Sequence, residues 1–251
     1  KFDLRPEPVE IRRFCESLVE LLAARAHGKG IGIAAHVDSD VPQSMVCDPN
    51  RLRQALLNLL GNAVKFTDKG GVSLLVAVAE GSILFKVRDS GRGIKDSDQQ
   101  RIFEEFEQVA TGTTRTHGGV GLGLSITRKL VSAMGGELLL ASEPKKGSQF
   151  TVSIPHLAGR HATGKQKLSG FVCDLLLTND IEAEALASTI MSQGGSAAIT
   201  NGAAIDPQSE KILLVDFKSA AALESHDRVA GYGRRIILIE PGERGELERM
   251  R

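Results

Sequence analysis

Apolar residues recur every three or four positions in three stretches of the chain, a spacing that predicts amphipathic helices. These stretches are residues 9–26, 49–63 and 122–134. Asp48 and Pro49 give the second helix an N-cap and a first-turn proline, and Gly135-Gly136 ends the third. A fourth, short helix is predicted at residues 97–106. Residues 111–123 carry small side chains without an apolar period, which indicates a loop.

Five other stretches have the alternation or the β-rich composition of strands. They are residues 31–37, 72–79, 82–87, 137–140 and 149–154. Glu80-Gly81 predicts a hairpin between the second and third, and a turn around Lys145-Lys146-Gly147 joins the last two. The resulting order predicts an α+β fold, a two-layer α/β sandwich with helices on one face of a mixed sheet.

The composition changes after Pro155. Residues 158–168 read as a linker, because up to Lys167 they contain no apolar residue larger than alanine. Strand-like and helix-like stretches then alternate at residues 171–177, 185–191, 211–215 and 236–239, which predicts βαβ units and a parallel sheet. We therefore expect one domain at residues 1–157 and a smaller α/β domain at residues 169–251.

Composition narrows the function classes. The 31 basic and 31 acidic residues cancel, which argues against a nucleic-acid partner. Cys15, Cys47 and Cys173 are too far apart to predict a zinc site or a disulfide framework. Apolar runs are too short to span a bilayer, and the start of the chain has no signal-peptide pattern. We expect a cytoplasmic part of a larger protein without direct membrane contact, and leave open whether the full-length protein is membrane-anchored.

The predicted second helix carries the first candidate site. Asn58 and Asn62 lie four residues apart and so share a helix face, and Lys65 follows one turn later. Two amide oxygens and a cation suit a hydrated Mg²⁺ that carries phosphates, since Mg²⁺ takes oxygen ligands and keeps several waters. The alternative is that both amides only face solvent or cap a neighbour.

Asp89 directly follows a predicted strand and is flanked by Gly91 and Gly93. A carboxylate in this position can accept a hydrogen bond from an exocyclic amine while the backbone approaches the ligand closely. The alternative is an ordinary Asp-Ser-Gly turn.

Residues 118–124 form a glycine-rich loop that opens onto the predicted helix at residues 122–134. Backbone N–H groups at a helix N-terminus can bind phosphate. The loop is not a Rossmann fingerprint, because Leu124 stands where the third glycine would fall. Residues 101–106 add an amphipathic turn with two aromatic side chains, for which core packing is the plain explanation.

The order and spacing of these four clusters resemble the N, G1, F and G2 boxes of the catalytic, ATP-binding domain of sensor histidine kinases. These domains belong to the wider gyrase, chaperone, kinase and mismatch-repair ATPase family. The resemblance covers about residues 1–156 and implies a Bergerat-type sandwich. Phe2-Asp3-Leu4 and the Asp48-x-x-Arg51-Leu52-x-Gln54 pattern are similar to the lead-in of hybrid kinases in particular.

The resemblance implies ATP and Mg²⁺ as cofactors. Asn62, together with Asn58, would hold Mg²⁺, and Lys65 would reach the phosphates. Phe66 would lie against the adenine, whose amino group Asp89 would bind. The rest of the nucleotide set would comprise Gly91, Gly93, Ile94, Gly119, Gly121, Leu122 and Gly123.

A lid over residues 109–118 is also implied. Arg115 would be its catalytic cation, and Phe103 and Phe106 would brace it.

Position 58 separates activities within this family. Related hydrolases have a glutamate there that activates water, whereas the amide of Asn58 cannot act as a general base. We therefore expect phosphoryl transfer to a protein. A non-catalytic ATP sensor and, less favoured, a hydrolase remain as alternatives.

None of the six histidines has the sequence context of a phosphate acceptor. The expected partners are thus a dimerising helical hairpin that bears the acceptor, absent from this chain, and a response regulator or phosphotransfer protein.

The second domain resembles a response-regulator receiver. Asp216 stands where a receiver accepts its phosphoryl group, so it is a candidate phosphosite. The acidic pair expected after the first strand is replaced by Thr178-Asn179-Asp180. We therefore expect a degenerate or truncated receiver that serves in docking.

Overall fold

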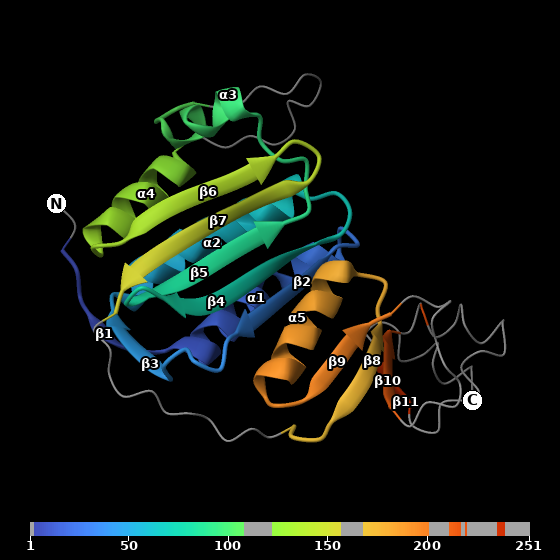
Figure 1. Ribbon diagram of the computed structural model, residues 1–251. Coiled ribbons are helices and arrows are strands. Elements are labelled where there is room, and N and C mark those ends of the chain that lie inside the picture. The colour runs from blue at the N-terminus through green and yellow to red at the C-terminus, as the bar shows by residue number, and fades with distance from the viewer. Residues whose placement is uncertain are drawn as a thin grey trace. The chain divides into compact units, whose positions relative to one another are not determined.

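The computed structural model describes residues 3–107, 122–156, 168–200, 211–216, 219 and 235–238. The chain divides into two compact units, Lys1–Thr163 and Gly164–Arg251. Each unit is described by itself below (Figure 1).

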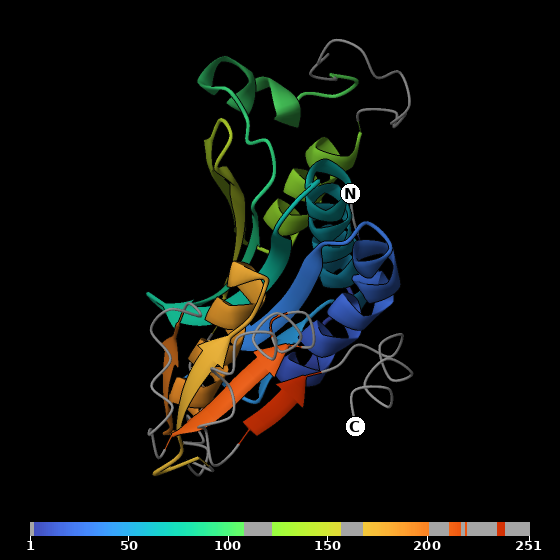
Figure 2. The same cartoon turned by 90° about the vertical axis from the view of Figure 1, so that its right-hand side faces the viewer.

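The first unit is built on a five-stranded mixed sheet. Its strands are β2 (Gly32–Val37), β4 (Gly71–Ala79), β5 (Ser82–Asp89), β6 (Glu137–Glu143) and β7 (Gly147–Pro155), in the order β2-β4-β5-β7-β6. Strands β2 and β4 run parallel, and the other neighbours are antiparallel. The helices α1 (Ile11–His27), α2 (Pro49–Phe66) and α4 (Gly123–Ala133) cover one face, as Figure 2 shows. The predicted two-layer fold is confirmed.

Helix α2 illustrates why these residues form these elements. The Asp48 carboxylate accepts hydrogen bonds from the backbone N–H groups of Asn50 and Arg51, both at 3.0 Å, and so caps the N-terminus. The apolar face predicted from the spacing is buried, at Leu52, Ala55, Leu56, Leu59, Leu60, Ala63 and Val64. It packs on the inward side chains of β4 and β5, which alternate as the sequence predicts and are fully buried at Val72, Leu74, Val76, Ile83, Phe85 and Val87.

One prediction for the first unit was wrong, and one pair of strands was missed. Residues 97–106 do not form one short helix. Helix α3 (Asp96–Gln99) is followed by the 3₁₀ helix η1 (Arg101–Phe103), and the backbone is extended at Glu104 and left-handed at Phe106, with φ of 65°. The sequence pattern also did not predict β1 (Glu7–Glu10) and β3 (Ser44–Cys47), which pair antiparallel.

The second unit contains a parallel sheet. Its strands are β8 (Val172–Leu176), β9 (Ser196–Ile199), β10 (Ile212–Asp216) and β11 (Arg235–Leu238), in the order β11-β10-β8-β9. Helix α5 (Asp180–Ser192) begins five residues before the predicted stretch, because the Asn179 side chain caps it through Ile181 and Glu182. The chain order of the strands, 2-1-3-4 along the sheet, is that of doubly wound folds of the receiver type. Its topological switch point lies between β8 and β10.

Candidate functional site

The described candidate residues come from three places in the first unit. Asn58, Asn62, Lys65 and Phe66 lie on the C-terminal half of α2; Asp89 ends β5 and is followed by Gly91, Gly93 and Ile94; Leu122 and Gly123 begin α4. The predicted Gly119, Gly121 and Arg115, and the predicted lid at residues 109–118, lie outside the described residues.

Asn58 joins α2 to α4. Its side-chain Nδ2 donates to Thr127 Oγ1 at 2.8 Å, and Thr127 Oγ1 donates to the carbonyl oxygen of Gly123 at 2.9 Å. A Cβ atom on Gly123 would lie 2.5 Å from Asn58 Oδ1, so the start of α4 packs closely against the Asn58 side chain. Asn58 therefore has a structural contact that needs no ligand. Sequence reasoning missed Thr127, because 69 residues separate it from Asn58.

Asp89 is a buried carboxylate at the end of the central strand β5. Its side chain accepts a hydrogen bond from the backbone N–H of Gly91 at 2.9 Å, and the residue is 7% exposed. Burial raises the pKa of Asp89 above its ordinary value, although hydrogen bonds from the backbone of Gly91 and Ser148 oppose this shift. The site thus holds a desolvated acceptor.

The glycines around Asp89 allow close backbone packing. A Cβ atom on Gly91 would lie 2.6 Å from the Phe66 carbonyl oxygen, so the turn after β5 touches the end of α2. Gly93 has φ of 67°, and a Cβ there would lie 2.0 Å from the Glu143 carbonyl oxygen. Gly147 makes the same kind of contact with the backbone of Asp89. Sequence reasoning placed Gly147 only in a hairpin turn.

Two cationic side chains lie over the ring of Phe66. Its ring is exposed, with the Lys65 ammonium nitrogen 4.9 Å and the Arg92 guanidinium carbon 4.6 Å from the ring centroid. Cations are attracted to aromatic rings at such distances. Sequence reasoning did not select Arg92, although it lies inside the Asp89–Ile94 cluster. Ile94 packs against the core, and its N–H donates to Ser142 Oγ at 2.8 Å.

The two aromatic residues of the 101–106 cluster differ in their surroundings. Phe103 packs against the core and meets Phe150 edge to face, with ring centroids 6.4 Å apart. Phe106 is 69% exposed. Lys129 of α4 forms an ion pair with Glu105, which ties α4 to the residues after η1.

A metal ion in this site would depend on the nucleotide. In the parts of the chain that the structure describes, no three His, Cys, Asp or Glu side chains gather into a group that could hold a metal ion. The amide oxygens of Asn58 and Asn62 suit Mg²⁺, which is typically bound through a few protein oxygens together with substrate phosphates and water.

In the second unit, Asp216 lies at the C-terminal end of β10, beside the switch point. Its carboxylate accepts hydrogen bonds from Thr178 Oγ1 at 2.6 Å, from Thr178 N–H, and from Ser219 N–H at 2.7 Å. Burial raises the pKa of Asp216, but the hydrogen bonds from Thr178 and Ser219 outweigh this effect and hold the pKa below its ordinary value. Hydrogen bonds from Thr178 and Ser219 therefore stabilise the Asp216 carboxylate as an anion.

In the first unit, a two-layer α/β sandwich, the end of α2 carries a lysine and an aromatic ring, and the end of β5 carries a buried carboxylate. Residues 47–158 match the family described as histidine kinase-, DNA gyrase B-, and HSP90-like ATPase. These residues therefore form a domain of that family, and the first unit resembles the ATP-binding domain of sensor histidine kinases.

Similar proteins include sensor histidine kinases. The chain is 41% identical over 159 residues to the signal transduction histidine-protein kinase BarA of Escherichia coli K12, covering 61% of this chain and 17% of BarA. It is 38% identical over 190 residues to the sensor histidine kinase RcsC of the same strain, covering 75% of this chain and 20% of RcsC. The chain thus spans at most about a fifth of these relatives.

Among solved structures, full-length ShkA in complex with AMPPNP is similar over 99% of this chain and 52% of the ShkA chain, with a TM-score of 0.83 and 34% identity. The match covers both units, each of which therefore has a counterpart in a solved protein. No helix within the described residues is both long and apolar enough to cross a membrane.

Proposed function

We propose that the first unit binds ATP with Mg²⁺ and transfers the γ-phosphoryl group to a histidine on a dimerising helical hairpin. The observation that carries the proposal is the convergence at the end of α2. There Gly91 connects the buried carboxylate of Asp89 to the Phe66 carbonyl, and two cations lie over the Phe66 ring. A hydrogen-bond acceptor and a positive surface side by side suit a nucleotide with an exocyclic amine and charged phosphates.

Each residue then has a stated role. Asp89 accepts from the adenine amino group, and Phe66 lines the base. Lys65 binds the phosphates, and Asn62 with Asn58 holds Mg²⁺. The ion supplies charge neutralisation for the transferring phosphoryl group. Gly119, Gly121, Leu122 and Gly123 complete the phosphate site, with Arg115 as the cation over it.

The choice of transfer over hydrolysis rests on Asn58. Its amide has no useful proton affinity near neutral pH, so it cannot activate a water molecule as a carboxylate would. Its Nδ2 atom is also engaged with Thr127. Phosphoryl transfer mainly requires positioning and charge neutralisation, and these the site can supply. The names of BarA and RcsC, both histidine kinases, support the same choice.

The direct test mixes the whole chain with labelled ATP and the separately purified histidine-bearing hairpin of the full-length protein. Label on the hairpin histidine is the expected result. Free phosphate without labelled hairpin would indicate a hydrolase instead, and binding of ATP with neither product would indicate a non-catalytic sensor. Label that appears stably on the isolated chain would contradict the absence of an acceptor histidine.

For the second unit, we propose a degenerate receiver that serves in docking to a response regulator or phosphotransfer protein. The parallel strand order β11-β10-β8-β9 supports the receiver likeness. Thr178 fills the space beside Asp216 where the first of the expected acidic pair would stand, and donates to it. Because the Thr178 hydroxyl donates a hydrogen bond to the Asp216 carboxylate, that carboxylate is poorly placed to bind Mg²⁺ and to accept a phosphoryl group.

A further inference from the structure

The C-terminus of α2 ends without the usual glycine. The last four carbonyl groups of a helix have no partner within it, and a left-handed glycine commonly follows to satisfy them. Here the next residue is Thr67, with extended backbone angles, φ of −99° and ψ of 124°. Thr67 satisfies only one of the four carbonyls, that of Ala63, through its N–H at 3.1 Å and its hydroxyl at 2.8 Å.

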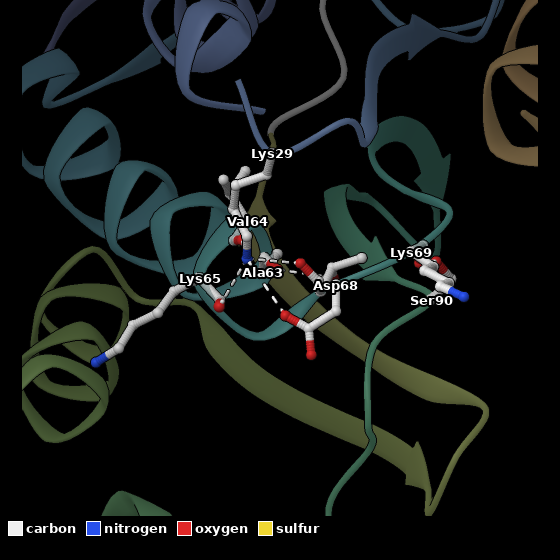
Figure 3. A network of polar contacts seen from close by, with 8 residues as sticks. Lys29, Ala63, Val64, Lys65, Asp68, Lys69 and Ser90 are labelled. Atoms are coloured by element: carbon white, nitrogen blue, oxygen red, sulfur yellow. Dashed lines mark hydrogen bonds and ion pairs between the residues drawn. The ribbon is translucent and has the colours of Figure 1, made fainter. Parts of the chain in front are cut away.

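Lys29 supplies the missing cap from another part of the chain. Its ammonium group donates to the carbonyl oxygens of Val64 at 2.8 Å, Lys65 at 3.1 Å and Thr67 at 2.7 Å. An ammonium has three donors, and these three bonds use all of them. Figure 3 shows the Lys29 side chain reaching these backbone oxygens.

The charge of Lys29 suits this position. A helix C-terminus carries partial negative charge, so a cation there is favourable. Lys29 is also 3.8 Å from the Asp68 carboxylate, but Asp68 is 94% exposed, and such an ion pair contributes little. The backbone carbonyls are therefore the main partners, and the Lys29 side chain, 30% exposed, is partly buried against them.

The turn that Lys29 holds is the one from which Lys65 extends. Lys29 contacts only the backbone of Lys65, whose own side chain points away from the Lys29 ammonium (Figure 3). The same helix end touches Gly91 through the Phe66 carbonyl. A change in this turn would thus move Lys65 relative to Asp89 and Gly91.

We propose that Lys29 is a positioning residue for the nucleotide site: by fixing the last turn of α2, it places the Lys65 ammonium where it meets the phosphates. This proposal rests on the proposed function, because Lys65 must bind phosphates for its placement to matter. Lys29 itself does not touch the nucleotide.

The test is a double-mutant cycle on the whole chain, with ATP and adenosine affinities measured by calorimetry in the presence of Mg²⁺. Lys29→Met should weaken ATP binding about tenfold, within the range found for coupled neighbours, and adenosine binding by less than about twofold. In a Lys65→Ala background the effect of Lys29→Met on ATP should vanish. Lys69→Met is the matched control, since it removes an exposed positive charge from the loop that follows α2 and should change ATP affinity by less than about twofold.

Thermal unfolding of each variant separates positioning from loss of the fold. If Lys29→Met does not fold, Lys29→Arg replaces it, because arginine keeps the charge but its planar fork cannot aim three donors from one nitrogen. Lys29→Arg should lose about threefold in ATP affinity, an intermediate loss on the scale of coupled neighbours, and again only when Lys65 is present.

The outcomes separate the two proposals. A wild-type chain that does not bind ATP would overturn the proposed function, and the role of Lys29 with it. A wild-type chain that binds ATP, with Lys29 variants that match Lys69→Met, would overturn the role of Lys29 alone. An equal loss with and without Lys65 would also overturn it, since the effect would then be one of charge or general stability.

Discussion

Replacing Asp89 by asparagine should weaken ATP binding without a matching loss of stability. The substitution keeps the side-chain shape and the acceptor for the Gly91 N–H, 2.9 Å away. It removes the charge that would bind the adenine amino group. A hydrogen bond to a charged group contributes about 1.5–3 kcal/mol, so ATP affinity should fall about 10- to 150-fold. Because Asp89 is only 7% exposed, water cannot easily replace the lost bond.

The Asp89 carboxylate, which would strengthen ATP binding, lowers the stability of the fold as the pH rises. Burial raises the pKa of Asp89 in the folded chain, so the unfolded chain, with an ordinary aspartate pKa of about 3.9, releases its proton at a lower pH. Folding stability from this group is therefore lost as the pH rises from the unfolded pKa to the raised folded one, and stays low above it. Asparagine avoids that loss. The asparagine amide accepts the hydrogen bond from the Ser148 N–H less well than the carboxylate does, but this loss of folding stability is the same at every pH.

The assay combines calorimetric titration with ATP and Mg²⁺ and chemical unfolding between about pH 4 and pH 8, a range that brackets the ordinary aspartate pKa. The stability of Asp89→Asn relative to the wild type should increase with pH and then level off. Asp3→Asn, which changes an exposed carboxylate, should alter neither ATP affinity nor this slope. Unchanged ATP affinity in Asp89→Asn would refute the adenine contact. A relative stability that falls with rising pH would refute the assignment of a desolvated carboxylate.

Three further predictions concern other parts of the chain. Gly93→Ala should lower the free energy of unfolding in urea by about 2–4 kcal/mol, because a Cβ would meet the Glu143 backbone at 2.0 Å. Gly81→Ala, at a similar φ with nothing within 4 Å, should cost only about 1 kcal/mol; equal costs would contradict the contact. Asn62→Ala should abolish the Mg²⁺ dependence of ATP affinity in titrations with and without the ion, and an unchanged dependence would remove the metal assignment. Asp216 should take no phosphoryl label from a small acyl phosphate with Mg²⁺; label at that residue, found by mass spectrometry, would show a working receiver.

Local signals explain which parts of the fold could be predicted from the sequence. Helix α2 has an N-cap, a first-turn proline and a regular apolar stripe, all within 18 residues, and each points to the same element. The β1–β3 pair has no such signal, because each strand is four residues long. Its pairing joins Glu7 to Cys47, and only the folded chain brings those residues together.

The same distinction applies to the site. Asn58, Asp89 and Gly91 were found because they form patterns of adjacent or periodic residues. Thr127 and Lys29 were not found, since each contacts α2 from a distant segment of the chain. Lys29 is separated by 35–38 residues from the carbonyl groups to which it donates, and it belongs to none of the four motifs. A lysine after a helix has no local feature that identifies it as the cap of another helix. Such contacts depend on tertiary structure, which a single sequence does not display.

Several motif residues have structural contacts of their own, and this limits what a loss of activity can mean. Replacing Asn58 would break its bond to Thr127, and replacing Gly93 would strain a turn. Either change could abolish ATP binding through the fold alone. Asp89 differs, because burial of its charged carboxylate lowers the stability of the fold, whereas the same charge would strengthen the hydrogen bond from the adenine amino group. A change there should separate binding from folding, so Asp89 is the position at which a functional assignment can be distinguished from a structural one.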